Sequence, residues 1–248
     1  MPRDERTLVT RLTPPAVPDA IAAGELQILG LLPNGSNFTF LARATAADGD
    51  RRLTVYKPRR GEVPLWDFAE GTLCQREVAA YVVATSLGWP NVPPTILRDG
   101  PEGPGSVQAF VRFEPHEHFF TLQDRFPDAF REVALFDLLV NNGDRKGGHC
   151  LLGEDGRIWV IDHGVCFSEE PKLRTVIWEF MEEPIPRPLI ADVERFRRDL
   201  DAGSLRRDLG ALLSEGELVA MARRAEVILA EPIYPTPVGE RPFPWPPV

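Results

Sequence analysis

The stretch that decides the fold reads NNGDRKGGHCLLGEDGRIWVIDHG and covers residues 141–164. A polar turn at 154–156 separates two short apolar runs, a pattern that predicts a β-hairpin over 149–161. A hairpin brings its two ends together, so we expect Asp144, before the first strand, and Asp162, after the second, to share one rim.

Two carboxylates at one rim repel each other unless a proton or a cation lies between them. Metal-assisted phosphoryl transfer uses this layout: Asp144 would position the acceptor hydroxyl, and Asp162 would hold a metal on the nucleotide phosphates. Either aspartate alone is equally typical of an ordinary turn or cap. The pair, framed by Gly-Asp-Arg and Ile-Asp-His-Gly, favours a functional site.

Lys57 stands out because only three of the 28 basic residues are lysines. It ends an expected strand over 53–57 in phase with Leu53 and Val55, so its ammonium group shares a face with apolar side chains and needs a partner. A strand-end lysine that reaches solvent is the alternative interpretation.

Glu77 is the candidate partner, because it interrupts the apolar stripe of a helix expected over 71–87. An ion pair between Glu77 and Lys57 would hold the lysine against nucleotide phosphates. The alternative is a boundary residue that pairs locally with Arg76 or another neighbour.

The turn between the first two expected strands contains Gly35, Ser36 and Asn37, small residues that would let backbone N–H groups approach phosphates. With one glycine, this segment is equally compatible with an ordinary hairpin turn. The chain contains no P-loop motif.

The remaining pattern predicts an α+β fold with two lobes. Strands or helices are expected over 21–32, 38–44, 53–57, 71–87, 107–113, 127–140, 149–161, 189–200, 204–213 and 215–230.

Proline and glycine predict that 91–105 is loop, and polar residues 114–125 are expected to form a hinge. We therefore expect an N-lobe over 1–113, a mainly helical C-lobe over 114–231 and a proline-rich tail over 232–248 that is extended or disordered.

A net charge of −9 argues against nucleic acid and anionic membranes as partners. The sequence contains no apolar run long enough to span a membrane and no secretory signal, so we expect a cytoplasmic protein. Cys74, Cys150 and Cys166 fit no zinc spacing and are expected to be reduced and buried. The oligomeric state stays open.

Along the chain the candidate residues come in the order Lys57, Glu77, Asp144 and Asp162. In this order the chain resembles the kinase superfamily, specifically its phosphatidylinositol 3-/4-kinase-like branch. Tyr56-Lys57-Pro58, Gly143-Asp144-Arg145 and Ile161-Asp162-His163-Gly164 carry the resemblance, which spans about residues 30–180. The whole chain also resembles an actinobacterial family with distant similarity to those kinases.

The resemblance implies a protein-kinase-like fold, with a small antiparallel sheet and one helix in the N-lobe. It also implies ATP as cofactor with Mg²⁺ or Mn²⁺, and backbone contacts from Val111–Phe113 to adenine. In this branch the fifth residue after the catalytic aspartate is a metal-binding asparagine, and here it is His149. Imidazole suits Mn²⁺ better than Mg²⁺, so we expect a Mn²⁺ preference or activity that falls as His149 protonates near pH 6.

The catalytic loop in this resemblance comprises Asp144, Arg145 and Lys146; the lysine would either touch the transferred phosphate or be loop surface. After the metal motif, Lys172 and Arg174 are balanced by acidic residues, so a phosphoinositide acceptor is unsupported. The sequence predicts an ATP-dependent phosphotransferase for a hydroxyl on a soluble metabolite or a protein. The alternatives are a nucleotide-binding pseudokinase with a regulatory role and an AMP-transferring relative.

Overall fold

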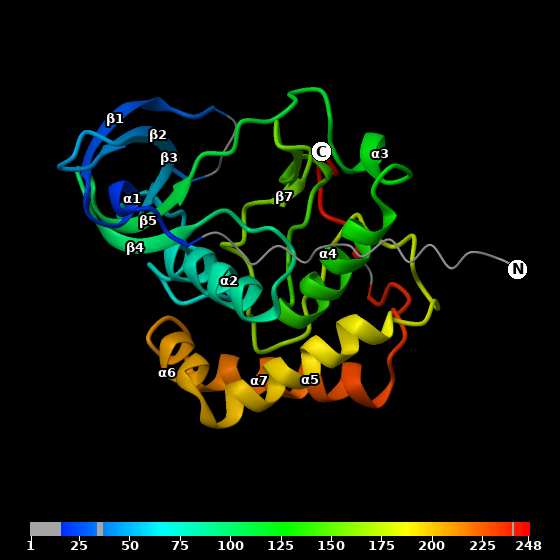
Figure 1. Cartoon of the computed structure of the whole chain (residues 1–248). Helices are drawn as coiled ribbons and strands as arrows, with labels where there is room; N and C mark the ends of the chain where they lie inside the picture. Colours follow the sequence, from blue (N-terminus) through cyan, green and yellow to red (C-terminus); the bar gives the residue numbers. More distant parts are fainter. Residues whose placement is uncertain (1–15, 34–36, 240) are drawn as a thin grey trace, which may run out of the picture.

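A computed structural model describes residues 16–33, 37–239 and 241–248. A five-stranded antiparallel sheet forms the first half, and helices form most of the second half (Figure 1). The elements of the N-lobe are α1 (Asp19–Ala23), β1 (Glu25–Leu31), β2 (Phe40–Thr45), β3 (Arg51–Pro58), a short 3₁₀ turn (Arg59–Gly61), α2 (Leu73–Leu87), β4 (Thr95–Gly100) and β5 (Gly103–Ala109).

The sheet has the strand order β1-β2-β3-β5-β4, which puts β3 at its centre. Thr54 and Tyr56 of β3 are buried on one face, where Tyr56 packs with Ile21 of α1 in a small apolar cluster. Because side chains alternate along a strand, Val55 and Lys57 lie on the opposite face and are only half-buried. The period-two pattern thus identified the face of Lys57, and that face lines a cleft.

Helix α2 is buried on almost every side, and its buried residues include Ala79, Val83 and Leu87. It contacts β4 and β5 above and α5 and α6 below, so it lies between the sheet and the C-lobe helices (Figure 1). A helix that is apolar all round must be covered on both faces. Gly88, in the left-handed conformation at φ 90°, ends it.

The C-lobe elements are α3 (Phe119–Leu122), α4 (Pro127–Val140), a 3₁₀ turn (Gly147–His149), β6 (Cys150–Leu152), β7 (Ile158–Val160), α5 (Arg187–Ala202), α6 (Ser204–Gly210) and α7 (Glu215–Ala230). β6 and β7 form the expected antiparallel hairpin, with Cys150 opposite Val160. The main core joins α2, α4, this hairpin and α5–α7. All three cysteines are free and buried, as predicted.

The prediction that 91–105 is loop is wrong. β4 occupies Thr95–Gly100, and β5 begins at Gly103, inside the same interval. Pro104 and Gly105 are part of β5, where they pair with Asp99 and Arg98 of the edge strand β4. Pairing between the two strands is therefore stronger than the local preference of proline and glycine for loops. The strand expected over 107–113 ends at Ala109, and the remainder is extended connection.

The tail is extended but is docked on the C-lobe. Tyr234 and Pro244 are buried, the Gly147 N–H donates to the Pro247 carbonyl at 2.7 Å, and the Thr175 N–H donates to the Pro242 carbonyl at 3.1 Å. A proline-rich chain loses little conformational entropy when it docks in an extended form, which composition alone did not reveal. Within the described ranges, no helix is long and apolar enough to cross a membrane.

The two-sided burial of α2 leads to a stability prediction. Leu87 is 1% exposed, so Leu87→Ala leaves a cavity in the main core and should lower the free energy of unfolding by about 2–5 kcal/mol in urea titrations. Val219→Ala, at an exposed position of α7, is the matched control and should change it by less than about 0.5 kcal/mol. Equal effects from both variants would contradict this account of α2.

Candidate active site

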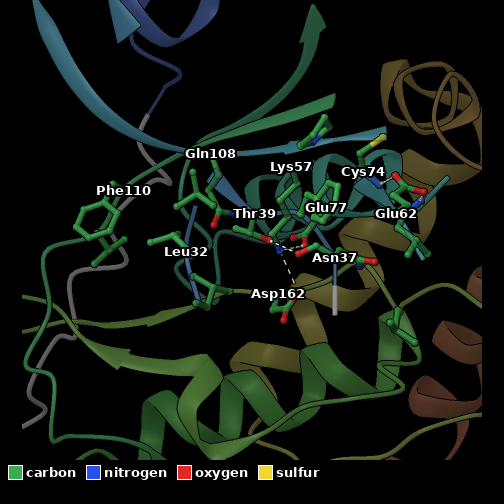
Figure 2. Close-up of a pocket in the computed structure, with 18 of the residues that line it drawn as sticks. Leu32, Asn37, Thr39, Lys57, Glu62, Cys74, Glu77, Gln108, Phe110 and Asp162 are labelled. Atoms are coloured by element: carbon green, nitrogen blue, oxygen red, sulfur yellow. Dashed lines mark hydrogen bonds and ion pairs between the residues drawn. The ribbon is translucent and has the colours of Figure 1, made fainter. Parts of the chain in front are cut away.

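A cleft of about 420 Å³ opens between the sheet and the β6–β7 hairpin, within the usual size range of small-molecule sites. Residues from both lobes line it, and Figure 2 shows Lys57, Glu77 and Asp162 converging inside it. Seven of the predicted site residues line this cleft: Asn37, Lys57, Glu77, Val111, Phe113, Asp144 and Asp162.

Lys57 bridges two carboxylates that are far apart in sequence. Its ammonium Nζ contacts Glu77 Oε1 on α2 and lies 3.0 Å from Asp162 Oδ1 after β7. Burial alone would lower the pKa of Lys57, but the charges of Asp162 and Glu77 outweigh it and the net pKa is raised. The ammonium is therefore a fixed positive charge in the cleft.

Glu77 is almost completely buried and uses both carboxylate oxygens. Oε1 accepts from Lys57, and Oε2 accepts from the backbone N–H of His163 at 3.0 Å. Burial and the nearby Asp162 raise its pKa, while Lys57 opposes that shift. Glu77 thus links α2 directly to the segment that carries Asp162, and it does not pair with Arg76.

Asp162 follows the last residue of β7 by two positions and has a φ of 63°, a left-handed conformation that is unusual for a residue with a side chain. The nearby Lys57 lowers its pKa, so the carboxylate is ionised. Its other oxygen, Oδ2, lies 3.4 Å from His149 Nε2. Strained backbone at a carboxylate that faces a cleft is typical of a functional site.

The surroundings of His149 do not support the expected loss of activity near pH 6. Burial and nearby cations lower its pKa to about 4, so the imidazole is neutral at pH 6 and above. A fall in activity caused by protonation of His149 near pH 6 is therefore not expected. A neutral imidazole has one unprotonated nitrogen, and this is the form that binds metals.

Asp144 lines the cleft on the side opposite the sheet. Burial raises its pKa, partly offset by Lys146, whose Nζ lies 3.4 Å from Asp144 Oδ2. A carboxylate with a raised pKa is a better proton acceptor than an ordinary aspartate. Lys146 is therefore a neighbour of Asp144, but it does not line the cleft.

Arg145 corrects the sequence analysis, which placed it among the catalytic residues. Its side chain is fully buried and donates to the Asp137 carboxylate on α4 from two nitrogens, Nη2 at 2.9 Å and Nε at 3.0 Å. Nη1 donates to the Ile161 carbonyl at 2.9 Å, and Nη2 lies 2.8 Å from His163 Nε2. Arg145 therefore holds the two aspartate-bearing loops together and cannot touch a substrate.

Val111 and Phe113 line the cleft between the lobes. Within the described part of the chain, the backbone N–H and C=O groups of Val111 make no intramolecular hydrogen bond, so they are available to a ligand. Asn37 lines the cleft and accepts a hydrogen bond from the Val63 N–H at 2.7 Å. Gly35 and Ser36 lie outside the described residues.

Sequence reasoning missed the apolar walls and one acidic residue. Leu32, Val55 and Leu151 face the cleft from both lobes, where they could enclose a flat ring. Glu62 accepts from the N–H groups of Leu73 and Cys74 and so caps α2. A carboxylate eleven residues before a helix gives no local capping signal, so only the fold reveals it.

Three comparisons place these features among known proteins. Protein Rv2133c of Mycobacterium tuberculosis is 40% identical over 263 residues, which cover 91% of this chain and 93% of that protein. Phosphatidylinositol 4-kinase gamma 4 of Oryza sativa subsp. japonica is 32% identical over 133 residues, or 44% of this chain and 22% of that much longer protein. No family model matches the chain.

The proinflammatory kinase CtkA of Helicobacter pylori has a similar structure, with a TM-score of 0.54 and 12% sequence identity. The match covers 89% of this chain and 96% of that one. The chain therefore has a kinase-like fold of mixed α and β structure, as the sequence predicted.

The burial of Arg145 leads to a second stability prediction. Arg145→Met should lower the free energy of unfolding by about 3–5 kcal/mol, because it leaves the buried Asp137 carboxylate without its partner. Lys146→Met, one residue away and partly exposed, should change it by less than about 1 kcal/mol. Urea unfolding of both variants measures the difference, and a tolerant Arg145→Met would overturn its structural assignment.

Proposed function

Because the chain belongs to the same family as Protein Rv2133c and has a kinase-like fold, we propose that it is an ATP-dependent phosphotransferase. The acceptor in this proposal is a hydroxyl group on a soluble metabolite or a protein. Membership of the phosphatidylinositol 3-/4-kinase-like branch belongs to the same proposal and is supported by the match to the rice protein.

The observation that carries the proposal is the bridge from Lys57 to Glu77 and Asp162. A lysine on a sheet, oriented by a helix glutamate beside a metal-binding aspartate, is the arrangement that protein kinases use to orient nucleotide phosphates. The bridge places one ammonium group and two carboxylates in a fixed arrangement at the cleft. Organised charges stabilise a transferring phosphoryl group without reorganising during the reaction.

The donor set fits a divalent metal that arrives with the nucleotide. Asp162 Oδ2 and His149 Nε2 are 3.4 Å apart and face each other, and the ring is neutral. The described residues contain no group of three or more His, Cys, Asp or Glu side chains that could hold a metal. Two protein ligands suit a cation whose remaining ligands are phosphate oxygens and water. Such a cation would neutralise charge on the phosphates.

The rest of the cleft matches the remaining parts of the reaction. The apolar walls at Leu32 and Leu151 would hold a purine ring, together with the backbone of Val111, which has no hydrogen-bond partner among the described residues. Asp144 would orient the acceptor hydroxyl and accept its proton, a role favoured by its raised pKa. The phosphoryl group would then pass to the acceptor oxygen, and ADP would leave.

Asp162→Asn tests the proposal directly. It should reduce ATP turnover by roughly 100-fold or more, because a neutral amide holds a divalent cation more weakly than a carboxylate does and cannot balance the charge of Lys57. Circular dichroism and urea unfolding should show a folded protein, since the side chain is half exposed. Asp155→Asn, in the hairpin turn, is the matched control and should keep full turnover. If Asp162→Asn kept full activity, Asp162 would have no role in the reaction.

The same assay separates the alternatives. Thermal stabilisation by ATP without turnover, in both Mg²⁺ and Mn²⁺ and with many acceptors, would identify a regulatory pseudokinase. Mass spectrometry of the protein and of candidate acceptors after incubation with ATP distinguishes an added phosphate from an added AMP. An added AMP would replace phosphoryl transfer by adenylyl transfer at the same site.

His149 generates a metal prediction. The wild-type protein should bind ATP more tightly with Mn²⁺ than with Mg²⁺, because imidazole nitrogen suits Mn²⁺ better. His149→Asn replaces the nitrogen ligand by an amide oxygen and should reduce the Mn²⁺ to Mg²⁺ affinity ratio. Calorimetric titration of nucleotide with each metal measures that ratio. A ratio that is the same in both proteins would show that His149 does not contact the metal.

A further inference from the structure

We propose that Arg76 and Glu217 form a positioning pair that holds α2 and the segment after Asp162 in the arrangement the cleft requires. The inference rests on the proposed function, because the arrangement that it explains is that of a nucleotide site. Neither Arg76 nor Glu217 lines the cleft, because both lie on the other side of α2.

Arg76 joins three segments that are distant in sequence. Its side chain on α2 is 3% exposed, Nη1 donates to the Cys166 carbonyl at 2.9 Å, and Nη2 contacts Glu217 Oε1 in the first turn of α7. Cys166 follows Asp162 by four residues. One guanidinium therefore connects the helix of Glu77, the segment of Asp162 and a C-lobe helix.

Glu217 is itself fixed, so the pair is a rigid anchor. Its Oε2 accepts from the Ser214 N–H at 2.8 Å, and its own N–H donates to Ser214 Oγ at 3.1 Å. This capping box orients the carboxylate at the start of α7 before Arg76 reaches it. A buried ion pair of good geometry is lost only at a large cost, because either charge alone would be left without a partner.

A second contact extends the anchor along the same segment. The Arg76 guanidinium carbon lies 4.6 Å from the centre of the Phe68 ring, and Lys172 Nζ lies 4.7 Å from the same centre. Lys172 also pairs with Asp67. The segment that follows Asp162 is therefore held near Cys166 by Arg76 and again at Lys172 by residues 67 and 68.

Helix geometry couples these contacts to the cleft. Neighbouring residues on an α-helix point about 100° apart, so Arg76 faces the C-lobe while Glu77 faces Lys57. A rotation or shift of α2 that withdrew Glu77 from Lys57 would also have to break the buried Arg76 contacts. The Arg76 contacts therefore oppose a movement of α2 that would take Glu77 away from Lys57.

Backbone hydrogen exchange tests the positioning role without depending on catalysis. Arg76→Met and Glu217→Gln, which keeps the capping geometry, should speed exchange of the His163 amide and of the α2 amides by about tenfold or more. Arg197→Met is the matched control, because Arg197 pairs with Glu226 of α7 without contacting α2, and it should leave those amides unchanged. Arg76→Lys should restore part of the protection.

Measuring MgATP binding distinguishes a positioning role that acts through Glu77 from a general contribution of Arg76 to stability. Arg76→Met should weaken MgATP binding in the wild-type background but add nothing in a Glu77→Gln background, because the effect passes through Glu77. Additive effects, or faster exchange spread evenly over the sheet and all helices, would overturn the inference. If the wild-type protein bound no MgATP, the proposed function would fail, and the exchange results alone would decide the role of Arg76.

Discussion

The structure depends on a single ammonium group that satisfies two carboxylates from different lobes. Lys57 on β3 contacts Glu77 on α2 and Asp162 after β7, so the sheet, the helix and the hairpin meet at one charge. Two carboxylates in a partly buried cleft would repel each other without it. The Lys57 ammonium group that joins the two lobes would also bind phosphate oxygens of a nucleotide. One positive charge at this place therefore serves both the fold and the proposed reaction.

Behind that charge lies a second layer of buried ionic contacts that faces away from ligand. Arg145 binds Asp137 of α4 and the Ile161 carbonyl, which sets the distance between the two aspartate-bearing loops. Arg76 binds Glu217 and the Cys166 carbonyl, which sets the place of α2. Both contacts of this second layer use arginine, whose planar group donates to several acceptors at once, whereas a lysine supplies the compact charge in the cleft.

The sequence predicted what local patterns encode. The hairpin, the helix over 127–140 and the face of Lys57 follow from turn chemistry and periodicity, and the shared rim follows from hairpin geometry. β4 was missed because its Pro- and Gly-rich surroundings conceal a strand that exists only through pairing with β5. Arg145 was misassigned because burial is invisible in a loop motif, and Glu217 has no sequence signal linking it to a residue 141 positions earlier.

The structure also changes how the segment after the metal motif is understood. Lys172 and Arg174 seemed balanced by nearby glutamates, but Lys172 is neutralised by Asp67 and lies against Phe68. Among the described residues, that leaves Arg174 as the basic side chain of 165–180 without an ion pair, and it is exposed. A phosphorylated inositol ring carries several charges and would need a cluster of cations. Within this segment one of the two cations is committed to the fold, which leaves Arg174 alone where a phosphoinositide would need several cations.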